Sequence, residues 1–253
     1  MAPSLGCSSL CSYMCALVVG ATAYLTAEAR GVEFSTSTIN GQQVTVCRVS
    51  IKEEKLELFL NDDAGRPLKS FDGINQWLSK RKQKLLFGMN AGMYHGDLSP
   101  VGLYVHESRE LTPLNLADDH GNFFMKPNGV FAVTTTGAHV VESSQYPKLP
   151  GKVLLATQSG PLLVIDGKIH PKFKPGSEFR LGRNGVGVPS PDVAVFVIIE
   201  TPVNLYDLAV FFRDVLKCPN ALYFDGTVSS LHSPKIGRND KLIDLGRVIG
   251  IVE

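Results

Sequence analysis

A carboxylate and a series of hydroxyls follow directly after one of the most apolar segments of the chain. Residues 221–224, Ala-Leu-Tyr-Phe, predict a buried strand, and Asp225-Gly226 is a typical turn dipeptide. Ser229 and Ser230 come a few residues later. The turn explains the Asp-Gly pair but leaves the hydroxyls unexplained, so the end of this strand is a candidate site for chemistry.

Glu200 stands at the end of a second apolar run, residues 193–199. That run is hydrophobic at both odd and even positions, which predicts a central strand covered on both faces. Glu200 and Asp225 together supply two carboxylates, the usual pair for breaking a glycosidic bond. One would act as general acid or base, and the other as a nucleophile or as the stabiliser of an oxocarbenium-like centre. The alternative for both is a structural role in capping a turn or a helix start.

Four further predicted strand boundaries carry Asn, Lys, Arg or Ser beside glycine. Each of these residues alone fits an ordinary turn or a solvated surface position. Strand ends of one sheet can converge, however, and the set suits an anionic ligand rich in hydroxyls, because Lys and Arg neutralise phosphate oxygens. We expect ligand contacts from Asn90, Lys126, Asn128, Ser159, Gly160, Arg183 and Asn184.

The sequence lacks the signatures of several other kinds of site. The six histidines show no metal-ligand spacing such as H-E-x-x-H, so no metal site is predicted. No Walker loop and no G-x-S-x-G elbow is present. A bound Ca²⁺ is compatible with the carboxylates, but nothing in the sequence requires a cofactor. The formal net charge of +1 provides no basic field, so no nucleic-acid partner is expected.

The N-terminal segment resembles a targeting sequence. Residues 11–29 are small and apolar, and Ala-Glu-Ala at 27–29 fits a signal-peptidase site, although no Lys or Arg precedes the apolar part. We therefore expect a signal peptide over residues 1–29, a domain over residues 30–253, and a secreted or periplasmic protein. The alternative is an uncleaved N-terminal anchor, which would be the only reason for contact with a membrane.

Cysteine usage is consistent with export. Cys7, Cys11 and Cys15 would leave with the signal peptide, so that Cys47 and Cys218 remain. In an oxidising compartment these two could pair and close a loop of about 170 residues, a constraint of about 3–5 kcal/mol. The alternative is a pair of buried free thiols.

The remaining pattern favours an α+β fold with mixed, mostly antiparallel sheets packed on a few helices, possibly arranged as two intertwined subdomains. Strand-like segments bounded by Gly, Pro, Asn or Asp dominate from about residue 32 onward. Helices are predicted over residues 70–84 and 204–217, with Ser70 and Asn204 as N-caps. Two helices are too few for regular β-α-β alternation.

Five segments in order give the chain a family resemblance. Together they resemble the phosphodiester glycosidase family, and the similarity extends over residues 44–252. The departure from the family signature Asp-Gly-Gly-x-Ser-Ser is Thr227, which replaces the second glycine. The segments are NAGMY (90–94), KPNGVF (126–131), TQSGPLLV (157–164), RNGVGV (183–188) and NALYFDGTVSSL (220–231).

The resemblance implies hydrolysis of a sugar-1-phosphodiester on the sugar side. It assigns Asp225, Gly226, Ser229 and Ser230 to the signature loop and Asn90 to the pocket lining. We therefore expect an exported hydrolase that cleaves the sugar–O bond of a glycosyl-1-phosphodiester in a glycan or glycoconjugate. Two alternatives are a non-catalytic binding module for anionic or phosphorylated glycans and a phosphodiesterase that cuts the P–O bond.

Overall fold

The computed structural model describes residues 31–226, 228–241 and 243–253. The predicted signal peptide, residues 1–29, and the signature position Thr227 therefore lie outside the described residues. Within the described ranges, no helix has both the length and the apolar composition needed to cross a membrane.

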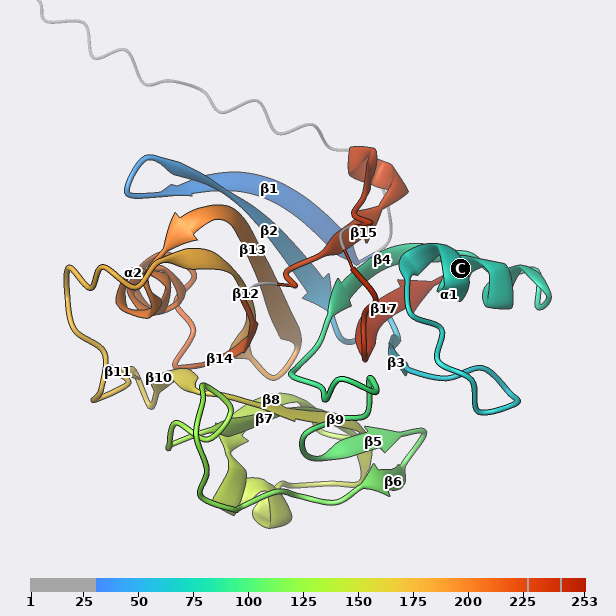
Figure 1. Ribbon diagram of the computed structural model, residues 1–253, viewed down its shortest axis with the longest axis horizontal. Helices are drawn as coiled ribbons and strands as arrows, with labels where there is room; N and C mark the ends of the chain where they lie inside the picture. The colour runs from blue at the N-terminus through green and yellow to red at the C-terminus, as the bar shows by residue number, and fades with distance from the viewer. Residues whose placement is uncertain (1–30, 227, 242) are drawn as a thin grey trace, which may run out of the picture.

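The largest sheet has seven strands, is antiparallel throughout and is called here the central sheet. Figure 1 shows it forming one side of the molecule, with β13 and β12 in its middle. In spatial order its strands are β1 (Val32–Ile39), β2 (Gln42–Ser50), β13 (Val193–Val203), β12 (Leu181–Ser190), β14 (Asn220–Asp225), β10 (Leu162–Ile165) and β11 (Lys168–Ile169).

Two five-stranded sheets complete the β-structure, and we call them the β4 sheet and the β7 sheet. The β4 sheet lies beside the central sheet and the β7 sheet packs below both in Figure 1. The β4 sheet contains, in order, β16 (Arg238–Asn239), β15 (Leu231–Ser233), β4 (Leu85–Asn90), β17 (Val248–Val252) and β3 (Leu56–Phe59). The β7 sheet contains β6 (Arg109–Thr112), β5 (Tyr104–His106), β9 (Val153–Ser159), β7 (Gly129–Thr134) and β8 (Gly137–Glu142).

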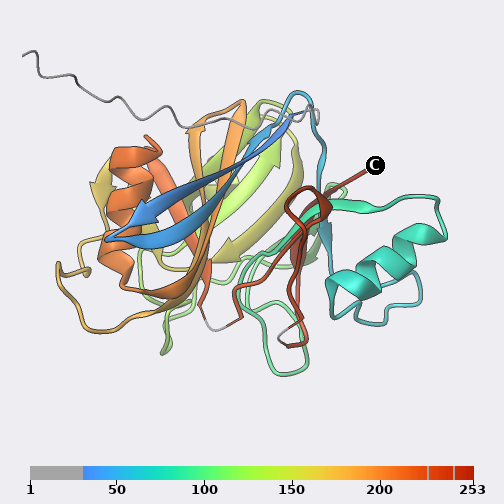
Figure 2. The same cartoon turned by 90° about the horizontal axis from the view of Figure 1, so that it is seen from above.

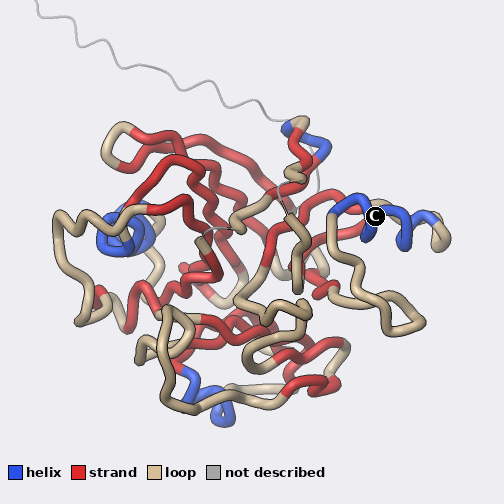
Figure 3. The backbone as a smooth tube through the Cα atoms, viewed as in Figure 1, coloured by secondary structure: helices blue, strands red, loops and turns tan. Residues whose placement is uncertain are grey.

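Helices are short and lie at opposite ends of the molecule (Figures 2 and 3). Helix α1 (Phe71–Ser79) begins where the Ser70 hydroxyl accepts a hydrogen bond from the Gly73 amide, at 3.0 Å. Helix α2 (Leu205–Val210) begins in the same way at Asn204 and continues as the π-helical turn η2 (Phe211–Val215). Two 3-10 turns, η1 (Ser143–Lys148) and η3 (Pro234–Ile236), complete the described helical segments.

The predicted helices are therefore confirmed, although the first is shorter than expected. It ends at Ser79, and Lys82 has a left-handed backbone with φ 57° that turns the chain toward β4. The predominance of antiparallel sheets confirms the α+β fold class.

Strand β13 is buried on both faces, which explains its continuous hydrophobicity. On one face Phe196 packs against Phe87 of the β4 sheet and Phe131 of the β7 sheet, with ring centroids 5.2 and 5.8 Å apart. On the other face Val197 belongs to the core beneath α2 that contains Phe212. One core thus draws on all three sheets, and a second lies between the central sheet and α2.

Of the two possibilities left open for Cys47 and Cys218, the structure agrees with the pair of buried free thiols and not with the candidate disulfide. Cys47 lies in the core shared by the three sheets, whereas Cys218 lies in the core beneath α2. The central sheet separates these two cores. Burial raises the pKa of both thiols, that of Cys218 to about 12, so both remain protonated and unreactive in the folded protein.

We expect thiol alkylation to confirm this separation. Folded protein should take up no alkyl group at Cys47 or Cys218, because both thiols are buried and protonated. Protein denatured without reductant should take up one group at each, measured by mass spectrometry of its peptides. A disulfide-linked pair of peptides containing these two residues would contradict the structure.

Candidate active site

Two hydrogen bonds hold Asp225 at the end of β14, one through its backbone amide and one through its carboxylate. Its amide donates to Asn184 Oδ1 at 2.9 Å, and its own Oδ1 accepts from the Gly226 amide at 2.6 Å. The following loop is closed by Ser229, whose hydroxyl donates to the Gly226 carbonyl at 2.8 Å. The carboxyl is therefore fixed in direction while the loop turns from the central sheet to the β4 sheet.

Two buried amides join the sheets directly beside Asp225. Asn90, at the end of β4, accepts at Oδ1 from Asn184 Nδ2 at 2.7 Å and from the Ser230 amide at 2.9 Å. Asn184 Nδ2 also donates to the Asn90 carbonyl at 3.1 Å. Both side chains are fully buried. Asn90 Nδ2 has no hydrogen-bond partner in the part of the chain that the structure describes, which leaves one donor for a ligand or water.

The carboxyl of Asp225 has an environment that opposes its charge. Burial raises its pKa to about 6, and only in part do the Gly226 N–H and the positive charge of Arg247 counter that effect. A carboxyl with such a pKa exchanges protons near neutral pH. Burial, together with the negative charge of Asp225, also raises the pKa of the Tyr94 phenol to about 12.

Arg247 is the residue near Asp225 that sequence reasoning missed. It is fully buried, and its guanidinium donates to the carbonyls of Leu103 at 2.9 Å, Met93 at 2.8 Å and Gln158 at 3.0 Å. Burial lowers its pKa to about 10. The only sequence signal for a buried arginine was its position between Gly246 and Val248, directly before an apolar strand.

Gly92 allows the guanidinium of Arg247 to lie against the backbone. It has φ 120°, and a Cβ there would stand 3.0 Å from Arg247 Nε. Arg247 Nε has no hydrogen-bond partner among the described residues.

The side chain of Arg183 lies on the opposite face of the central sheet from the side chain of Asn184. Its guanidinium donates to the Val203 carbonyl at 2.7 Å and to the Tyr223 hydroxyl at 3.1 Å, and it is fully buried. These contacts lie on the α2 side of the central sheet, where Val203 and Tyr223 belong to the core. The protein itself occupies these donors, and the geometry gives no support for a phosphate contact.

Lys126, Asn128 and Gly160 form a separate cluster around the loop that precedes β7. Lys126 Nζ pairs with the Asp118 carboxylate at 2.5 Å and donates to the Leu116 carbonyl at 2.8 Å. Asn128 Nδ2 donates to the Phe123 carbonyl at 2.9 Å, and a Cβ at Gly160 would stand 2.6 Å from the same oxygen. The side chains of Lys126 and Asn128 are therefore bound to other protein groups, and the role of this cluster in ligand contacts stays a prediction.

The serines have structural contacts near Asp225. Ser159 is fully buried, and its hydroxyl donates to the Phe224 carbonyl at 2.8 Å, which ties β9 to β14 one residue before Asp225. The Ser230 hydroxyl donates to the Val228 carbonyl at 3.0 Å. Each hydroxyl oxygen can still accept a hydrogen bond.

Glu200 does not form a contact pair with Asp225. Its exposed carboxylate forms an ion pair with Arg238, which in turn holds Asp240 at 2.7 Å. Glu200 also lines a cavity of its own between β13 and the β16 region. In the described ranges, no three His, Cys, Asp or Glu side chains come together in a way that could hold a metal ion.

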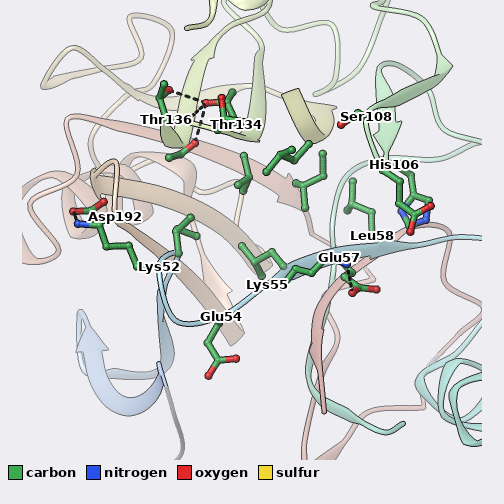
Figure 4. Close-up of a pocket in the computed structure, with 18 of the residues that line it drawn as sticks. Lys52, Glu54, Lys55, Glu57, Leu58, His106, Ser108, Thr134, Thr136 and Asp192 are labelled. Atoms are coloured by element: carbon green, nitrogen blue, oxygen red, sulfur yellow. Dashed lines mark hydrogen bonds and ion pairs between the residues drawn. The ribbon is translucent and has the colours of Figure 1, made fainter. Parts of the chain in front are cut away.

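A cavity of about 770 Å³ lies elsewhere, and none of the predicted site residues lines it. Figure 4 shows it between the segment after β2 and the end of the β7 sheet. Several of its polar groups bind each other: Lys52 pairs with Asp192 at 2.7 Å, and the hydroxyls of Thr134 and Thr136 are 2.8 Å apart. We therefore place the candidate active site at Asp225, where Asn90, Asn184, Ser229 and Ser230 converge.

The amide pair should contribute measurably to stability. Asn90→Ala leaves the buried Ser230 N–H without its side-chain acceptor and Asn184 Nδ2 with the Asn90 carbonyl alone. An unpaired buried donor costs about 1–3 kcal/mol, and the second donor loses its shorter bond, so a loss of about 2–4 kcal/mol is expected in urea unfolding. Asn184→Ala should cost a similar amount. Because both remove the same contact, the double variant should lose clearly less than the sum. Additive losses would show that the two amides act independently.

Comparison with known sequences supports a family assignment. The model of the phosphodiester glycosidase family matches residues 83–244. The Escherichia coli protein YigE, whose role is uncharacterised, is 36% identical over 144 residues, which are 57% of this chain and 56% of that protein. The match thus spans little more than half of the length of this relative.

Solved structures with the same fold are distant in sequence. The zebrafish N-acetylglucosamine-1-phosphodiester alpha-N-acetylglucosaminidase catalytic domain, auto-inhibited by its pro-peptide, matches with a TM-score of 0.58 and 13% identity over 88% of this chain and 82% of that chain. A Synechocystis protein matches with a TM-score of 0.53 and 13% identity, over 89% and 64% of the two chains. A Burkholderia pseudomallei protein described as exported matches with 0.50 and 12%, over 83% and 74%.

At such identities the structures demonstrate a shared fold and nothing finer. The family match covers well over half of the chain, however, and it agrees with the resemblance carried by the five sequence segments. The chain belongs to the phosphodiester glycosidase family.

Proposed function

We propose that the protein is an exported hydrolase that cleaves the sugar–O bond of a glycosyl-1-phosphodiester in a glycan or glycoconjugate, with Asp225 as its catalytic carboxylate. The observation that carries this proposal is the environment of Asp225, a carboxyl fixed by Asn184 and Gly226 with a pKa raised to about 6 by burial. Family membership gives the reaction class its support.

The proposed chemistry is displacement at the anomeric carbon. A water molecule attacks that carbon, its proton passes to the Asp225 carboxylate, and the C–O bond breaks with its electron pair on the phosphate oxygen. The products are a free sugar and a phosphomonoester. A phosphate leaving group needs little protonation to depart. The reaction therefore needs a general base with a pKa of about 6 more than it needs a general acid.

Partner groups near Asp225 suit a polar substrate. Asn90 Nδ2 is a buried donor without a partner in the described residues, and the Ser230 hydroxyl oxygen can accept a further hydrogen bond. Arg247 places a positive charge beside the site, although its donors hold backbone carbonyls. Its positive charge would favour an anionic substrate, while its hydrogen bonds hold the surrounding backbone in place and are not free for phosphate.

Export and location rest on the N-terminal sequence. Residues 1–29 have the pattern of a signal peptide, and one structure with the same fold comes from a protein described as exported. We infer a secreted or periplasmic enzyme without a required cofactor. Membrane contact would arise only with an uncleaved N-terminal segment.

The second candidate function is a binding module for anionic glycans. It is favoured by one observation: Glu200, the second predicted carboxylate, pairs with Arg238 and makes no contact with Asp225. Reaction in heavy-oxygen water separates the candidates. Label in the sugar supports the proposed glycosidase, label in the phosphate supports P–O cleavage, and absence of product across a panel of sugar-1-phosphodiesters supports the binding module.

Asp225→Asn should abolish phosphomonoester release while preserving the fold, because an amide cannot accept the proton of water in this pH range. Release is measured against the sugar-1-phosphodiester that the wild-type protein turns over. Asp166→Asn is the matched control, since Asp166 is exposed with φ 47°, a conformation that Asn tolerates, and it should keep full activity. Wild-type rates in Asp225→Asn would refute the role of Asp225.

Stability should depend on pH through Asp225. Its pKa rises from 3.8 to about 6 on folding, so folded protein binds the proton more tightly, and stability falls as pH rises from about 4 to about 6. Asp225→Asn removes this loss. The variant should therefore gain about 1–3 kcal/mol over wild type at about pH 7.5 and little at about pH 4. Urea unfolding at both pH values measures this, and an equal difference at the two would contradict the raised pKa.

A further inference from the structure

The cavity of about 770 Å³ lies along the free edge of the β4 sheet, away from the candidate active site. Strand β3 is the last strand of that sheet, so only one of its edges is paired, with β17. Figure 4 shows Lys52 to Leu58 on one side of the cavity and Thr134 and Thr136 of the β7 sheet on the other. We call it the β3 cavity.

The main-chain groups of β3 alternate between β17 and the free edge. The Leu58 carbonyl accepts from the Tyr104 hydroxyl of the β7 sheet at 3.4 Å, so it points away from β17. Because the N–H and C=O groups of successive residues alternate in direction, those of Leu56 share this side and those of Glu57 point to β17. Within the described ranges, no other hydrogen bond reaches the outward groups of Leu56 and Leu58. This edge is therefore a template on which a further strand can pair.

Lys55, directly before β3, is the residue type that protects an edge strand from other chains. Its ammonium lies 2.9 Å from the Glu57 carboxylate, so its charge is balanced by the neighbouring strand residue. At the other end the edge is closed, because the Leu60 carbonyl accepts from the Leu68 amide at 2.9 Å. The open part is thus limited to the four residues of β3, about 13 Å of extended chain.

The two faces of β3 offer different surfaces to an added strand. Leu56 and Leu58 belong to the core that the three sheets share. Val133 and Leu155 of the β7 sheet belong to the same core and line the cavity, so its inner wall is apolar. Glu57 lies on the opposite face of β3. An added strand would therefore place apolar side chains toward the inner wall and polar side chains on the face of Glu57.

The β3 cavity has an excess of negative charge. Its lysines, Lys52 and Lys55, are both paired with carboxylates. Glu53 and Glu107 add negative charge that no lysine or arginine of the described lining balances, and Glu107 has one exposed contact with Arg109 at 3.9 Å. The chain as a whole carries a formal net charge of +1, so the excess is local. The cavity therefore attracts a basic ligand and repels an acidic one.

A second copy of this chain is a less suitable occupant of the edge. Two β3 strands paired across a two-fold axis would set the negative charge of one cavity against that of the other. Like charges opposite one another destabilise a strand pair. The edge therefore favours a partner of opposite charge.

We propose that the β3 cavity is a docking site for an extended basic segment of another protein, in which Lys or Arg alternates with apolar residues. The segment adds to β3 as a further strand, antiparallel like the other pairs of the β4 sheet. Its apolar side chains pack on the inner wall and its basic side chains lie near Glu53 and Glu107. The pairing is short, so binding should be weak and reversible. The site is separate from Asp225, so docking goes beyond the proposed hydrolysis and does not depend on it.

The first test alters the main chain of a peptide. Isotope-labelled protein, as processed by its expression host, is titrated with an acetylated and amidated peptide of alternating lysine and valine. The amides of Leu56 and Leu58 should shift and exchange more slowly with solvent, because they donate to the peptide. N-methylation of the valines should abolish binding, since the residues opposite Leu56 and Leu58 in an antiparallel pair present their N–H groups to β3. N-methylation of the lysines is the matched control and should leave binding unchanged.

The second test alters charge. Glu53→Gln combined with Glu107→Gln should weaken binding of the lysine–valine peptide about fivefold, the effect of two exposed charge pairs. Glu142→Gln combined with Glu178→Gln, at two exposed positions outside the cavity lining, should leave binding unchanged. A peptide with glutamate in place of lysine should not bind.

Each contrary outcome overturns the proposal. Absence of binding, or any other order of affinities for the two methylated peptides, would refute strand addition to β3. Equal affinities of the two double variants would refute recognition by charge. A dimer in sedimentation that excludes the peptide would assign the edge to a second copy of the chain. None of these measurements requires turnover, so the proposed function stands or falls separately.

Discussion

The candidate site depends on the hydrogen bond between Asn184 Nδ2 and Asn90 Oδ1. Asn90 ends β4 and Asn184 lies within β12, a strand of a different sheet, and both side chains are fully buried. An amide in such a place cannot exchange its partner for water, so the strand ends must remain in register with one another. Because Asn184 Oδ1 also holds the Asp225 amide and Asn90 Oδ1 also holds the Ser230 amide, both ends of the signature loop are fixed by one contact.

This contact explains which parts of the site could be predicted from the sequence. Polar residues beside apolar runs were visible, and four of them, Asn90, Asn184, Asp225 and Ser230, do converge. Only Asn90 and Asp225 end strands, because Asn184 lies within β12 and Ser230 precedes β15. The helix caps Ser70 and Asn204 were equally visible, since a cap depends on residues within one turn.

The sequence did not predict on which face of a sheet each polar side chain lies. Arg183 and Asn184 are adjacent, so they point to opposite faces of β12, and the sequence does not say which face meets the β4 sheet. β12 and β14 also shift register between Asn184 and Gly185, an irregularity that the residue pattern does not predict. For the same reason the sequence left open whether Cys47 and Cys218 pair, although they lie in two different cores.

Arg247 shows why burial dominates the electrostatics of the site. A buried guanidinium near a carboxyl would normally hold that carboxyl ionised and lower its pKa. Here the donors of Arg247 are directed at the carbonyls of Met93, Leu103 and Gln158, so the charge acts on Asp225 through space and without a hydrogen bond. Desolvation then outweighs this attraction, and the pKa of Asp225 stays near 6 instead of falling below 4. The arginine thus joins the segments at Met93 and Leu103 to strand β9, and the carboxyl keeps the basicity that proton transfer near neutral pH requires.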